Sequence, residues 1–596
     1  MSGAAGAQDE LAHSDSSTPA KGKMSTFGQK IWSIEAPNLR RAGRISKALN
    51  LDPLTATLLV NRGIEDEEDA WRFLNPSLQQ LHDPFLISHM EEAVLRVRRA
   101  LARNEGILVF GDDDVDGLTS TTVIFEFLRT LGGDVRAFIP QRAKHGHGIT
   151  QKALDVALEG HQTHLMITAD CGLSALAEIA YVASKGIDTI IVDHHEMPEL
   201  LPEAVILNPR TRGSRFPFRE LAAVGVAFKF ICALRSHFAM LGVFANGSGP
   251  LVEESLDLVS LGTVADVVPL IDENRVFVSL GLEVLRRRRR CGVSALLEKV
   301  TSEEERITER TICYRLAPRL NAAGRMGDAN RCVSMLSTDR YAVAQSFAHD
   351  LEGYNEKRQA TEGEVLREAI EIAEEQVADG RKVLVVYKEG WHQGVLGIVA
   401  SRLLERFHRP TLLIAVRDGR ARGSARSPSE FGVLNLLHGC EDLIENYGGH
   451  AVAAGLTMDS VNLPELSRRI EAQALEVLKS GLISEPMLRI DAEVGFDDLS
   501  LAQVKKFEKL GPFGAGNMEP TFLLHGARTL SSRVVGRNHL RAKVRIDRSV
   551  LDVIGFSMGD TVLTRGVLVD LVLTPRITST HHDQIELQLL AVQEKE

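Results

Sequence analysis

The sequence contains no long hydrophobic run. Its 596 residues include no stretch of about 18 consecutive apolar residues, so we expect no transmembrane helix and no membrane association. The first 25 residues also lack the apolar core of a secretory signal and are rich in serine, glycine and alanine. We therefore predict a disordered tail over residues 1–25 and a cytoplasmic protein.

Cysteines and aromatic residues are scarce. The six cysteines are scattered and form no Cys-x-x-Cys pair, which argues for a reducing cytosol and against a zinc ribbon or a disulfide framework. Aromatic residues make up 5% of the chain, and the formal net charge of −11 is not typical of a protein that binds nucleic acid. Nucleic-acid binding is not excluded, because it depends on local fields and bound metal ions invert the local charge.

Apolar strands alternate with helical segments between residues 106 and 208. The apolar strands are GILVF, DVRAFI, HLMITA, DTIIVD and AVILNP, and helices are expected near 120–131, 151–159 and 174–185. Continuous apolar strands that alternate with helices predict an α/β domain whose parallel sheet is covered on both faces. In such sheets, functional sites form at the carboxyl ends of the strands.

The rest of the chain predicts further domains, since 596 residues exceed what one hydrophobic core can hold. Residues 40–104 and 220–338 have helical patterns, and residues 339–378 have the composition of one long connecting helix or of two. A second α/β pattern begins at RKVLVVYKEG. Short strands separated by turns after residue 486 predict a small β-barrel.

Four carboxylates stand within five positions at the end of the first apolar strand: Asp112, Asp113, Asp114 and Asp116. Two unit charges about 4 Å apart repel by roughly 4 kcal/mol at an effective dielectric constant of about 20. Bound cations, basic side chains or solvation in an exposed loop would each offset this repulsion. Taken alone, the segment fits a solvated turn or a single structural cation as well as it fits a catalytic site.

Polar residues also follow the later strands. Asp170 follows HLMITA, His194 and His195 follow DTIIVD, and Asn208 follows AVIL. Asp266 is the sole charge within the apolar stretch LVSLGTVADVVPL. Each has a simpler explanation, such as a helix N-cap for Asp170 or an exposed loop for the histidines. Together, carboxylates and imidazoles at the same end of successive parallel strands predict a site for two Mn²⁺ or Mg²⁺ ions about 3.5–4 Å apart, which would activate water for a phosphoryl displacement.

At these residues the sequence resembles a known superfamily. The segments DDDVDG, TADCG, VDHHE and LGTVADVVPL, in this order, are similar to the four motifs of the DHH phosphoesterases. Later segments resemble the RecJ-type single-strand-specific exonucleases; they include APRLNAAGRMGDA, NEKRQATE, GWHQGVLGIVASRLLERFHRPTLL, GSARS, GGHAVAAGLTM and LGPFGAGNMEP. The resemblance extends from about residue 40 to residue 596.

The resemblance implies a metal centre with two Mn²⁺ or Mg²⁺ ions. The positions that match its metal ligands are Asp112, Asp114, Asp116, Asp170, His194, His195 and Asp266. The resemblance also assigns these residues, apart from Asp112, to catalysis. Asp113 stands where the family has an aromatic or bulky residue, and we expect it to be a bystander. His145-Gly146-His147-Gly148 replaces the Glu-Gly-Tyr-Gly of relatives. This departure affects how the loop is expected to contact substrate, and it leaves the metal core unchanged.

The resemblance also implies residues that bind the nucleic acid. The expected residues are Arg319, Asn321, Arg325, Gly448, Gly449, His450 and Arg537. A guanidinium group is a planar donor fork suited to phosphate, and glycines permit close approach of the backbone. Without the family context, surface salt bridges would explain the first arginines better. The run Arg286–Arg290 is typical of a solvated helix face, although it could also guide a nucleic-acid backbone.

The implied fold is α/β, with a parallel-sheet DHH domain, a long connecting helix, a second α/β domain and a C-terminal OB-like barrel. The predicted bounds are 26–338 for the catalytic domain with its N-terminal helices, 339–378 for the connecting helix, 379–480 for the DHH-associated substrate-binding domain and 481–596 for the OB-fold. In the barrel, Arg533, Arg541 and Lys543 supply charge for gripping a single strand, whereas Phe522 and Phe556 are expected in the core.

The activity that the resemblance implies is a metal-dependent 5′-to-3′ exonuclease. It would hydrolyse single-stranded DNA to 5′-mononucleotides in recombination and repair, as a monomer with single-strand-binding-protein and helicase partners. Three alternatives remain: a relative acting on very short oligonucleotides or cyclic dinucleotides, a non-catalytic DNA-binding scaffold, and a soluble inorganic pyrophosphatase. The intact acidic set argues against the scaffold, and the C-terminal barrel argues for long strands.

Overall fold

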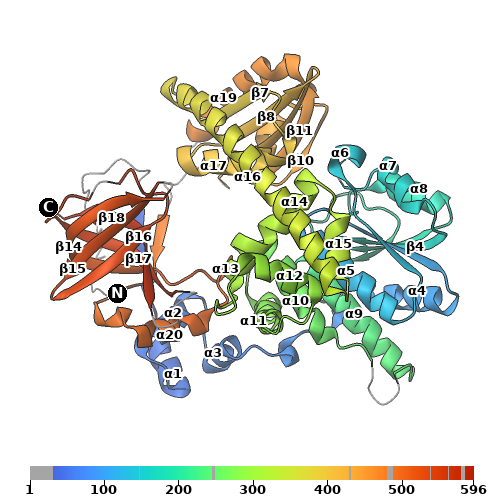
Figure 1. The fold of residues 1–596 in the computed structure, drawn as a ribbon, viewed down its shortest axis with the longest axis horizontal. Helices are drawn as coiled ribbons and strands as arrows, with labels where there is room; N and C mark the ends of the chain where they lie inside the picture. Colours follow the sequence, from blue (N-terminus) through green and yellow to red (C-terminus); the bar gives the residue numbers. More distant parts are fainter. Residues whose placement is uncertain are drawn as a thin grey trace, which may run out of the picture.

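The fold is described from a computed structural model (Figure 1). It describes residues 31–146, 148–244, 249–428, 431–479, 487–536, 538–561, 563–578 and 584–595. The predicted disordered tail over residues 1–25 lies outside the described residues, as do His147 and Arg537.

The first α/β unit contains the predicted parallel sheet. Its strands are β2 (Gly106–Gly111), β3 (Val135–Phe138), β4 (Thr163–Ala169), β5 (Asp188–Val192) and β6 (Val205–Leu207), in the order β3-β2-β4-β5-β6. Its helices are α4 (Met90–Ala102), α5 (Val115–Thr130), α6 (Arg142–His145), α7 (Gln151–Leu158) and α8 (Leu176–Ser184). All neighbouring strands in this sheet are parallel, which confirms the predicted fold class.

Helices cover both faces of this sheet. Ile107 and Val109 of β2 pack with α4, α5 and α9 (Ala223–Met240) on one face, whereas Leu108 and Phe110 pack with α7 and α8 on the other. The alternation follows from the two-residue period of a strand. Helix α5 begins at Val115, earlier than predicted, because the side chain of Asp114 caps it by accepting a hydrogen bond from the Gly117 N–H at 3.1 Å.

A helical region follows the sheet. It consists of α9 (Ala223–Met240), α10 (Leu256–Ala265), α11 (Asp272–Arg286), α12 (Cys291–Val300), α13 (Glu309–Thr311), a π-helix (Ile312–Leu316), α14 (Ala317–Met326) and α15 (Asn330–Leu336). Among the described residues, α9 is the one helix long and apolar enough to cross a membrane, but 67% of it is buried within the fold, as is typical of a core helix. The connecting segment is one helix of 38 residues, α16 (Tyr341–Ala378).

The second α/β domain lies at the far end of α16 (Figure 1). Its elements are β7 (Leu384–Glu389), α17 (Leu396–Phe407), β8 (Thr411–Arg417), β9 (Arg420–Arg426), α18 (Val433–His438), β10 (Asn446–Gly449), β11 (Ala453–Asp459) and α19 (Leu463–Lys479). The strand order is β10-β11-β9-β8-β7. Only the β7–β8 pair of this sheet is parallel, so β10 and the loop after it project from an antiparallel edge.

The C-terminal strands close into a barrel. The elements are β12 (Met487–Ile490), β13 (Ala492–Glu493), α20 (Leu501–Phe507), β14 (Phe522–Val535), β15 (His539–Ile546), β16 (Ser549–Gly555), β17 (Leu568–Ile577) and β18 (Ile585–Glu594). The barrel order is β14-β15-β16-β18-β17, and β17 pairs back with β14. Closure leaves no free edge among these five strands, as in other small barrels.

The N-terminal helices share their core with the barrel. They are α1 (Leu39–Leu49), α2 (Pro53–Asn61) and α3 (Glu67–Leu74), and β1 (Ile31–Ile34) pairs in parallel with β12. Buried side chains such as Ile45 and Leu59 join Phe507 and Phe522 in one hydrophobic cluster. The predicted catalytic domain over residues 26–338 groups these helices with the parallel sheet, whereas their apolar faces pack against α20 and the barrel. We refer to β1, α1–α3 and the elements from β12 to β18 as the C-terminal unit, and to the parallel sheet with α4–α15 as the catalytic unit.

Short 3₁₀ helices connect the larger elements. They span Leu78–Gln80, Pro84–Leu86, Val252–Ser255, Gln393–Val395, Glu441–Leu443, Ser460–Asn462, Asp497–Leu499 and Glu508–Leu510. The last of these, next to α20, leads into the segment that contacts the catalytic unit.

Candidate metal centre

The carboxyl ends of three neighbouring strands bring the acidic residues and histidines together. Asp112 follows β2, Asp170 follows β4, and His194 and His195 follow β5. The Nε2 atom of His194 lies 3.4 Å from Asp170 Oδ1 and 3.5 Å from Asp266 Oδ2. Asp266 comes from the C-terminal end of α10, so a residue distant in sequence completes the cluster.

The side chains form adjoining sets whose ligand atoms lie within 4.8 Å of one another. The sets are Asp112, Asp114 and Asp170; Asp116, His194 and Asp266; and Asp170, His194 and His195. Asp170 and His194 each belong to two sets, so the three sets form one continuous cluster. All seven predicted metal ligands appear in these sets, but their assignment as ligands remains a prediction.

Three polar atoms of the cluster are buried without a hydrogen-bond partner. They are Asp112 Oδ1, Asp170 Oδ1 and His194 Nε2. A buried polar atom that lacks a partner costs about 1–3 kcal/mol. Carboxylate oxygen and imidazole nitrogen are ligands suited to Mn²⁺ or Mg²⁺, so a divalent cation would satisfy all three atoms. The donor set therefore fits the implied ions.

The electrostatics of the cluster also favour a cation. Burial, followed by repulsion from Asp114, raises the pKa of Asp112 and that of Asp116 to about 7. Burial, followed by repulsion from Asp116, raises the pKa of Asp266 to about 8. Burial lowers the pKa of His194 to about 4, which keeps its imidazole neutral and free to act as a ligand.

These pKa shifts predict that stabilisation by Mn²⁺ increases with pH. Carboxyl groups whose pKa is raised to about 7–8 hold protons at low pH and must release them to bind a metal ion. In the metal-free fold, a raised carboxyl pKa stabilises the protein at low pH, and this contribution is lost as the pH rises through the folded value. Both effects therefore increase the stabilisation by Mn²⁺, relative to the metal-free protein, as the pH rises.

We therefore expect the melting-temperature difference between Mn²⁺-loaded and chelator-treated protein to widen between about pH 6 and about pH 8, with apparent affinity rising about tenfold per pH unit for each proton displaced. Differential scanning fluorimetry across buffers checks this result. A difference that stays constant over the range would contradict the proton–metal competition.

Asp193 is a functional residue that the sequence did not single out. Its Oδ1 accepts hydrogen bonds from the backbone N–H of His194 at 2.7 Å and from that of His195 at 3.1 Å, and it lies 2.7 Å from His195 Nδ1. This contact is the main cause that raises the pKa of His195 to about 9. A carboxylate behind a histidine fixes the ring orientation. The Asp-His-His sequence was the signal for this role.

Asp116 and Asp114 also hold the scaffold. The carboxylate of Asp116 accepts hydrogen bonds from the backbone N–H groups of Ala223 at 2.7 Å and Val224 at 2.8 Å, which cap the start of α9. Asp114 caps α5. The metal-binding loop is therefore fixed to two helices before any ion binds.

His450 of the second α/β domain faces the cluster. Its ring lies nearly parallel to that of His195, with 6.4 Å between ring centroids and an angle of 6°. Gly449 before it has φ +146°, and a Cβ there would lie 2.3 Å from the Ala453 carbonyl oxygen, so this position requires glycine. A Cβ on Gly448 would meet no atom within 4 Å. His195 of the first α/β domain and His450 of the second thus lie next to each other.

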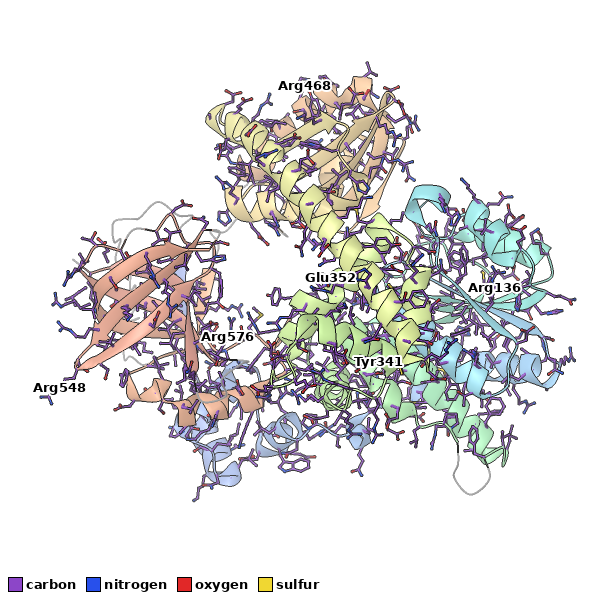
Figure 2. The ribbon with its side chains drawn as sticks, viewed as in Figure 1. Arg136, Tyr341, Glu352, Arg468, Arg548 and Arg576 are labelled. Carbon is purple, nitrogen blue, oxygen red and sulfur yellow. The ribbon has the colours of Figure 1, made fainter. Side chains whose placement is uncertain are left out.

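The residues of the RLNAAGR segment make contacts within the protein. Arg319 pairs with Glu352, with 2.6 Å between Nε and Oε2, and Glu352 lies on α16 (Figure 2). Asn321 Oδ1 accepts the backbone N–H of Val115 at 3.1 Å, at the start of α5. Arg325 donates to the Gly394 carbonyl oxygen at 3.0 Å, which links the two α/β domains. These contacts connect α14 to α16, to the start of α5 and to the second α/β domain. Phosphate contact by the three residues remains a prediction.

Asp113 differs from the expected bystander. Its side chain is 3% exposed and forms a two-oxygen ion pair with Arg142, at 2.6 and 2.8 Å from Arg142 Nε. Arg142 begins α6, which ends at His145, one of the two histidines that depart from the family pattern in this loop. The carboxylate therefore anchors this loop beside the metal-binding residues. Its partner is distant in sequence, so no local signal indicated the pair.

The barrel presents a polar groove of about 330 Å³. Its lining residues are Ser531, Ser532, Arg533, Arg541, Ala542, Lys543 and Asp552. Arg541 pairs with Asp552 at 2.9 Å across neighbouring strands. Phe522 is fully buried, as expected, whereas Phe556 is 41% exposed, so the expectation that it lies in the barrel core was wrong. Its strand β16 ends at Gly555, which places Phe556 in the turn that follows.

Comparison with known proteins identifies three domain families along the chain. Residues 106–263 match the DHH family, N-terminal domain; residues 380–476 match the DHHA1 domain; and residues 490–592 match the RecJ OB domain. The three matched regions coincide with the parallel sheet and its first helices, the second α/β domain and the barrel.

Curated relatives and solved structures extend the similarity to most of the chain. The single-stranded-DNA-specific exonuclease RecJ of Dickeya dadantii is 36% identical, covering 86% of this chain and 90% of its own length. The RecJ of Bacillus subtilis is also 36% identical over 89% of this chain, which spans 66% of that relative. The crystal structure of Thermus thermophilus RecJ in complex with Mn²⁺ has a TM-score of 0.79 and 30% identity, covering 95% of this chain and 80% of its own. With this identity over nearly the full length of a relative, and with all three domains in place, the chain belongs to the RecJ family of the DHH superfamily.

Proposed function

We propose that this protein is a metal-dependent exonuclease that hydrolyses single-stranded DNA from its 5′ end and releases 5′-mononucleotides. The observation that carries the proposal is the set of buried, unpartnered ligand atoms on Asp112, Asp170 and His194. They occur at the strand ends of a chain whose relatives are named single-stranded-DNA-specific exonucleases. Action in recombination and repair follows from membership of the family.

The residues divide into two metal-holding sets. Asp112, Asp114 and Asp170 would hold one Mn²⁺ or Mg²⁺ ion, and Asp116, His194 and Asp266 the other. When bound, the ions supply the positive charge that activates water and offsets the charge of the phosphodiester. Asp193 orients His195, and His450 limits the space opposite it.

Substrate binding would use the second domain and the barrel. A Cβ on Gly448 would meet no atom within 4 Å, which leaves room for a phosphate beside Gly449 and His450, and Arg533 and Lys543 line the barrel groove. Arg319, Asn321, Arg325 and Arg537 belong to the same proposal through their match to the family motifs. The domain bounds 26–338, 339–378, 379–480 and 481–596, a monomeric state, single-strand-binding-protein and helicase partners, and a cytoplasmic location are proposals of the same kind.

A labelled-strand assay tests the proposed activity. We expect single strands labelled at the 5′ end to lose their label as mononucleotide at once, whereas 3′-labelled strands shorten progressively. Hydrolysis should require Mn²⁺ or Mg²⁺ and stop with a chelator, because the carboxylates cannot polarise water themselves. Blunt duplexes should persist. Immediate release of the 3′ label would contradict the polarity, and degradation in chelator would contradict the metal requirement.

The barrel groove favours long strands over the alternative of very short substrates. A dinucleotide cannot reach from the metal centre to a separate domain, so a groove lined by Arg533 and Lys543 would have no use for it. In a length series, kcat/KM should therefore rise with strand length. A maximum at the dinucleotide would favour the oligonucleotide-specific relative instead.

A further inference from the structure

A loop of the C-terminal unit contacts the catalytic unit beside a metal-site residue. This docking loop, residues 510–518, contains the sequence LGPFGAGNM. Its Ala515 carbonyl oxygen accepts a hydrogen bond from the backbone N–H of Leu270 at 2.7 Å. Leu270 lies four residues after Asp266, in the turn that joins α10 to α11. The loop therefore touches the segment that leaves the metal centre.

Hydrogen bonds hold the docking loop in its conformation. Gly514 and Asn517 exchange two backbone hydrogen bonds, at 2.9 and 3.1 Å, which form a tight turn. The buried side chain of Asn517 donates to the Leu510 and Pro512 carbonyl oxygens, both at 2.8 Å, and accepts from Arg62 Nε at 2.8 Å. Every polar atom of this asparagine side chain is thus paired within the C-terminal unit. Because these hydrogen bonds hold the loop in one conformation, a displacement of the loop would also displace the residues that it contacts.

The fit between the loop and the turn is close. A Cβ on Gly514 would lie 2.8 Å from Leu270 Cδ1. A Cβ on Gly516 would lie 2.9 Å from Pro269 Cβ and 3.3 Å from Pro269 Cα, and Gly516 also has φ +72°. Gly516 is therefore required both by its close approach to the turn and by its backbone conformation, whereas a Cβ on Gly514 would displace the end of the Leu270 side chain.

Arg275 fixes the other end of the contacted segment. Its guanidinium donates to the carbonyl oxygens of Phe73 at 2.9 Å, Leu510 at 2.9 Å and Gly511 at 2.8 Å, all of which belong to the barrel side. Arg275 is 4% exposed. The first turn of α11 is thereby clamped to the start of the docking loop, so the residues between Asp266 and Arg275 are held at two points.

The backbone directly after Asp266 has a strained conformation. Val267 has φ +61°, which a β-branched residue rarely adopts. Its side chain is 65% exposed, so packing of that side chain does not enforce the conformation. A disfavoured backbone persists where surrounding contacts over-determine it, and the neighbouring contacts are those of the docking loop.

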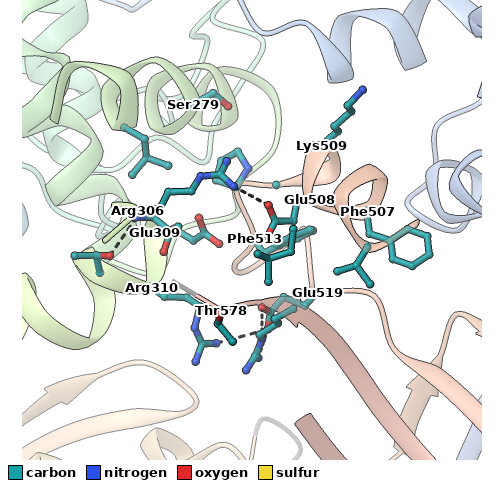
Figure 3. A pocket seen from close by; sticks show the side chains of 18 of the residues that line it. Ser279, Arg306, Glu309, Arg310, Phe507, Glu508, Lys509, Phe513, Glu519 and Thr578 are labelled. Carbon is teal, nitrogen blue, oxygen red and sulfur yellow. Dashed lines mark hydrogen bonds and ion pairs between the residues drawn. The ribbon is translucent and has the colours of Figure 1, made fainter. Parts of the chain in front are cut away.

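A cavity lies on the other side of these contacts. It measures about 670 Å³ and is lined by residues of both units, including Ser279, Glu309, Phe507 and Phe513 (Figure 3). Its lining includes none of the seven predicted metal ligands. Besides the docking loop, the ion pair between Arg306 and Glu508, at 2.6 Å, spans the two units here. The open space shows that the units are not packed together throughout, which makes the docking loop the closer connection.

We infer that the docking loop positions Asp266 for metal binding, so that the seating of the C-terminal unit sets the geometry of the metal centre. Gly514, Gly516 and Arg275 are positioning residues, because they act on Asp266 through the turn at 267–271. The inference rests on the proposed function for its metal site. It goes further in giving the barrel unit a second role besides holding a strand.

The test compares glycine-to-alanine variants of the full chain. Gly516→Ala should weaken one of the two Mn²⁺ binding events, the one that uses Asp266, about tenfold. Mutations of residues that hold a metal ligand in place typically lower metal affinity about 10–100-fold. The other event, on Asp112, Asp114 and Asp170, should be unchanged. Electron paramagnetic resonance of free Mn²⁺ during titration measures both. On a long single strand, kcat at limiting Mn²⁺ should fall about tenfold with KM unchanged.

Gly566→Ala is the matched control. Gly566 also has positive φ, +90°, in the C-terminal unit, but a Cβ there meets no atom within 4 Å. This variant carries the same kind of backbone strain without touching the turn, and its Mn²⁺ affinity should equal that of the wild type. If Gly516→Ala does not fold, Gly514→Ala gives the same comparison through Leu270.

Equal Mn²⁺ binding in wild-type protein and in the folded Gly516→Ala or Gly514→Ala variant would overturn the inference, since a loop that only attaches the barrel would leave the ions unaffected. Loss of single-strand affinity in chelator, with both Mn²⁺ events intact, would overturn it as well. Wild-type protein that binds Mn²⁺ and does not hydrolyse DNA would overturn the proposed function and leave the positioning role standing. Wild-type protein that binds no Mn²⁺ would overturn both.

Discussion

His194→Ala is expected to abolish hydrolysis of single-stranded DNA, with kcat lower by about 10³-fold or more, while the protein remains folded. The imidazole belongs to two of the three ligand sets, one of which is the proposed metal site with Asp116 and Asp266, so its loss removes a ligand that this site needs. Its Nε2 is buried without a hydrogen-bond partner, and burial keeps it neutral by lowering its pKa to about 4. The atom is therefore available to a metal ion and contributes little else to the fold.

Asp116→Ala should cost as much activity but more stability. Its carboxylate is a proposed ligand and also accepts the backbone N–H groups of Ala223 and Val224, and loss of a helix cap costs about 1 kcal/mol. Turnover at saturating Mn²⁺ and thermal unfolding separate the two effects. His438→Ala is the control, since its side chain is 71% exposed in the second domain. Near-normal turnover by His194→Ala would contradict the assignment of the metal centre.

The position of the site could be predicted because it follows from local rules. Polar residues directly follow β2, β4, β5 and β6, and parallel strands present their carboxyl ends at one edge. Asp112, Asp170 and His194 meet there for that reason. Asp266 arrives from a helix, and its lone charge in an apolar stretch was the only local sign of its role.

The partners of individual side chains could not be predicted, since they depend on contacts between distant segments. Arg319 matches a position that the family resemblance assigns to phosphate contact, and in the fold it pairs with Glu352 on the connecting helix. Asp113 pairs with Arg142. The N-terminal helices have amphipathic patterns that fit any apolar surface, and only the fold shows that the barrel supplies it. Period and composition determine that a face is buried, and not what buries it.

The arginine run illustrates the same limit. The sequence predicts a solvated helix face for residues 286–290. Arg289 fits this prediction, because its side chain is 65% exposed and pairs with Glu254. Arg290 does not. It pairs with Glu126 of α5 at 2.6 Å and with Asp257 of α10 at 2.7 Å, and it donates to the Leu336 carbonyl oxygen at 3.0 Å. It thereby joins three helices, two of which lead to the metal centre.

Arg290→Met should therefore lower the free energy of unfolding of the catalytic unit by about 3–5 kcal/mol, because it leaves Glu126 and Asp257 without their partner in a site where Asp257 is 5% exposed. Urea denaturation followed by circular dichroism measures the change. Arg289→Met, the neighbouring control, should change it by less than about 1 kcal/mol, as for exposed ion pairs.

We expect this loss of stability to come from the buried charges of Glu126 and Asp257 that are left without a partner, and not from the lost attraction to Arg290. A triple variant distinguishes these two causes. Arg290→Met combined with Glu126→Gln and Asp257→Asn removes all three charges at similar volume, and replacing a buried ionic set in this way is often close to neutral. The triple variant should recover most of the lost stability. If it is as unstable as Arg290→Met alone, then the hydrogen bond to Leu336 and the packing of the arginine stem hold the helices together, and the ion pairs contribute little.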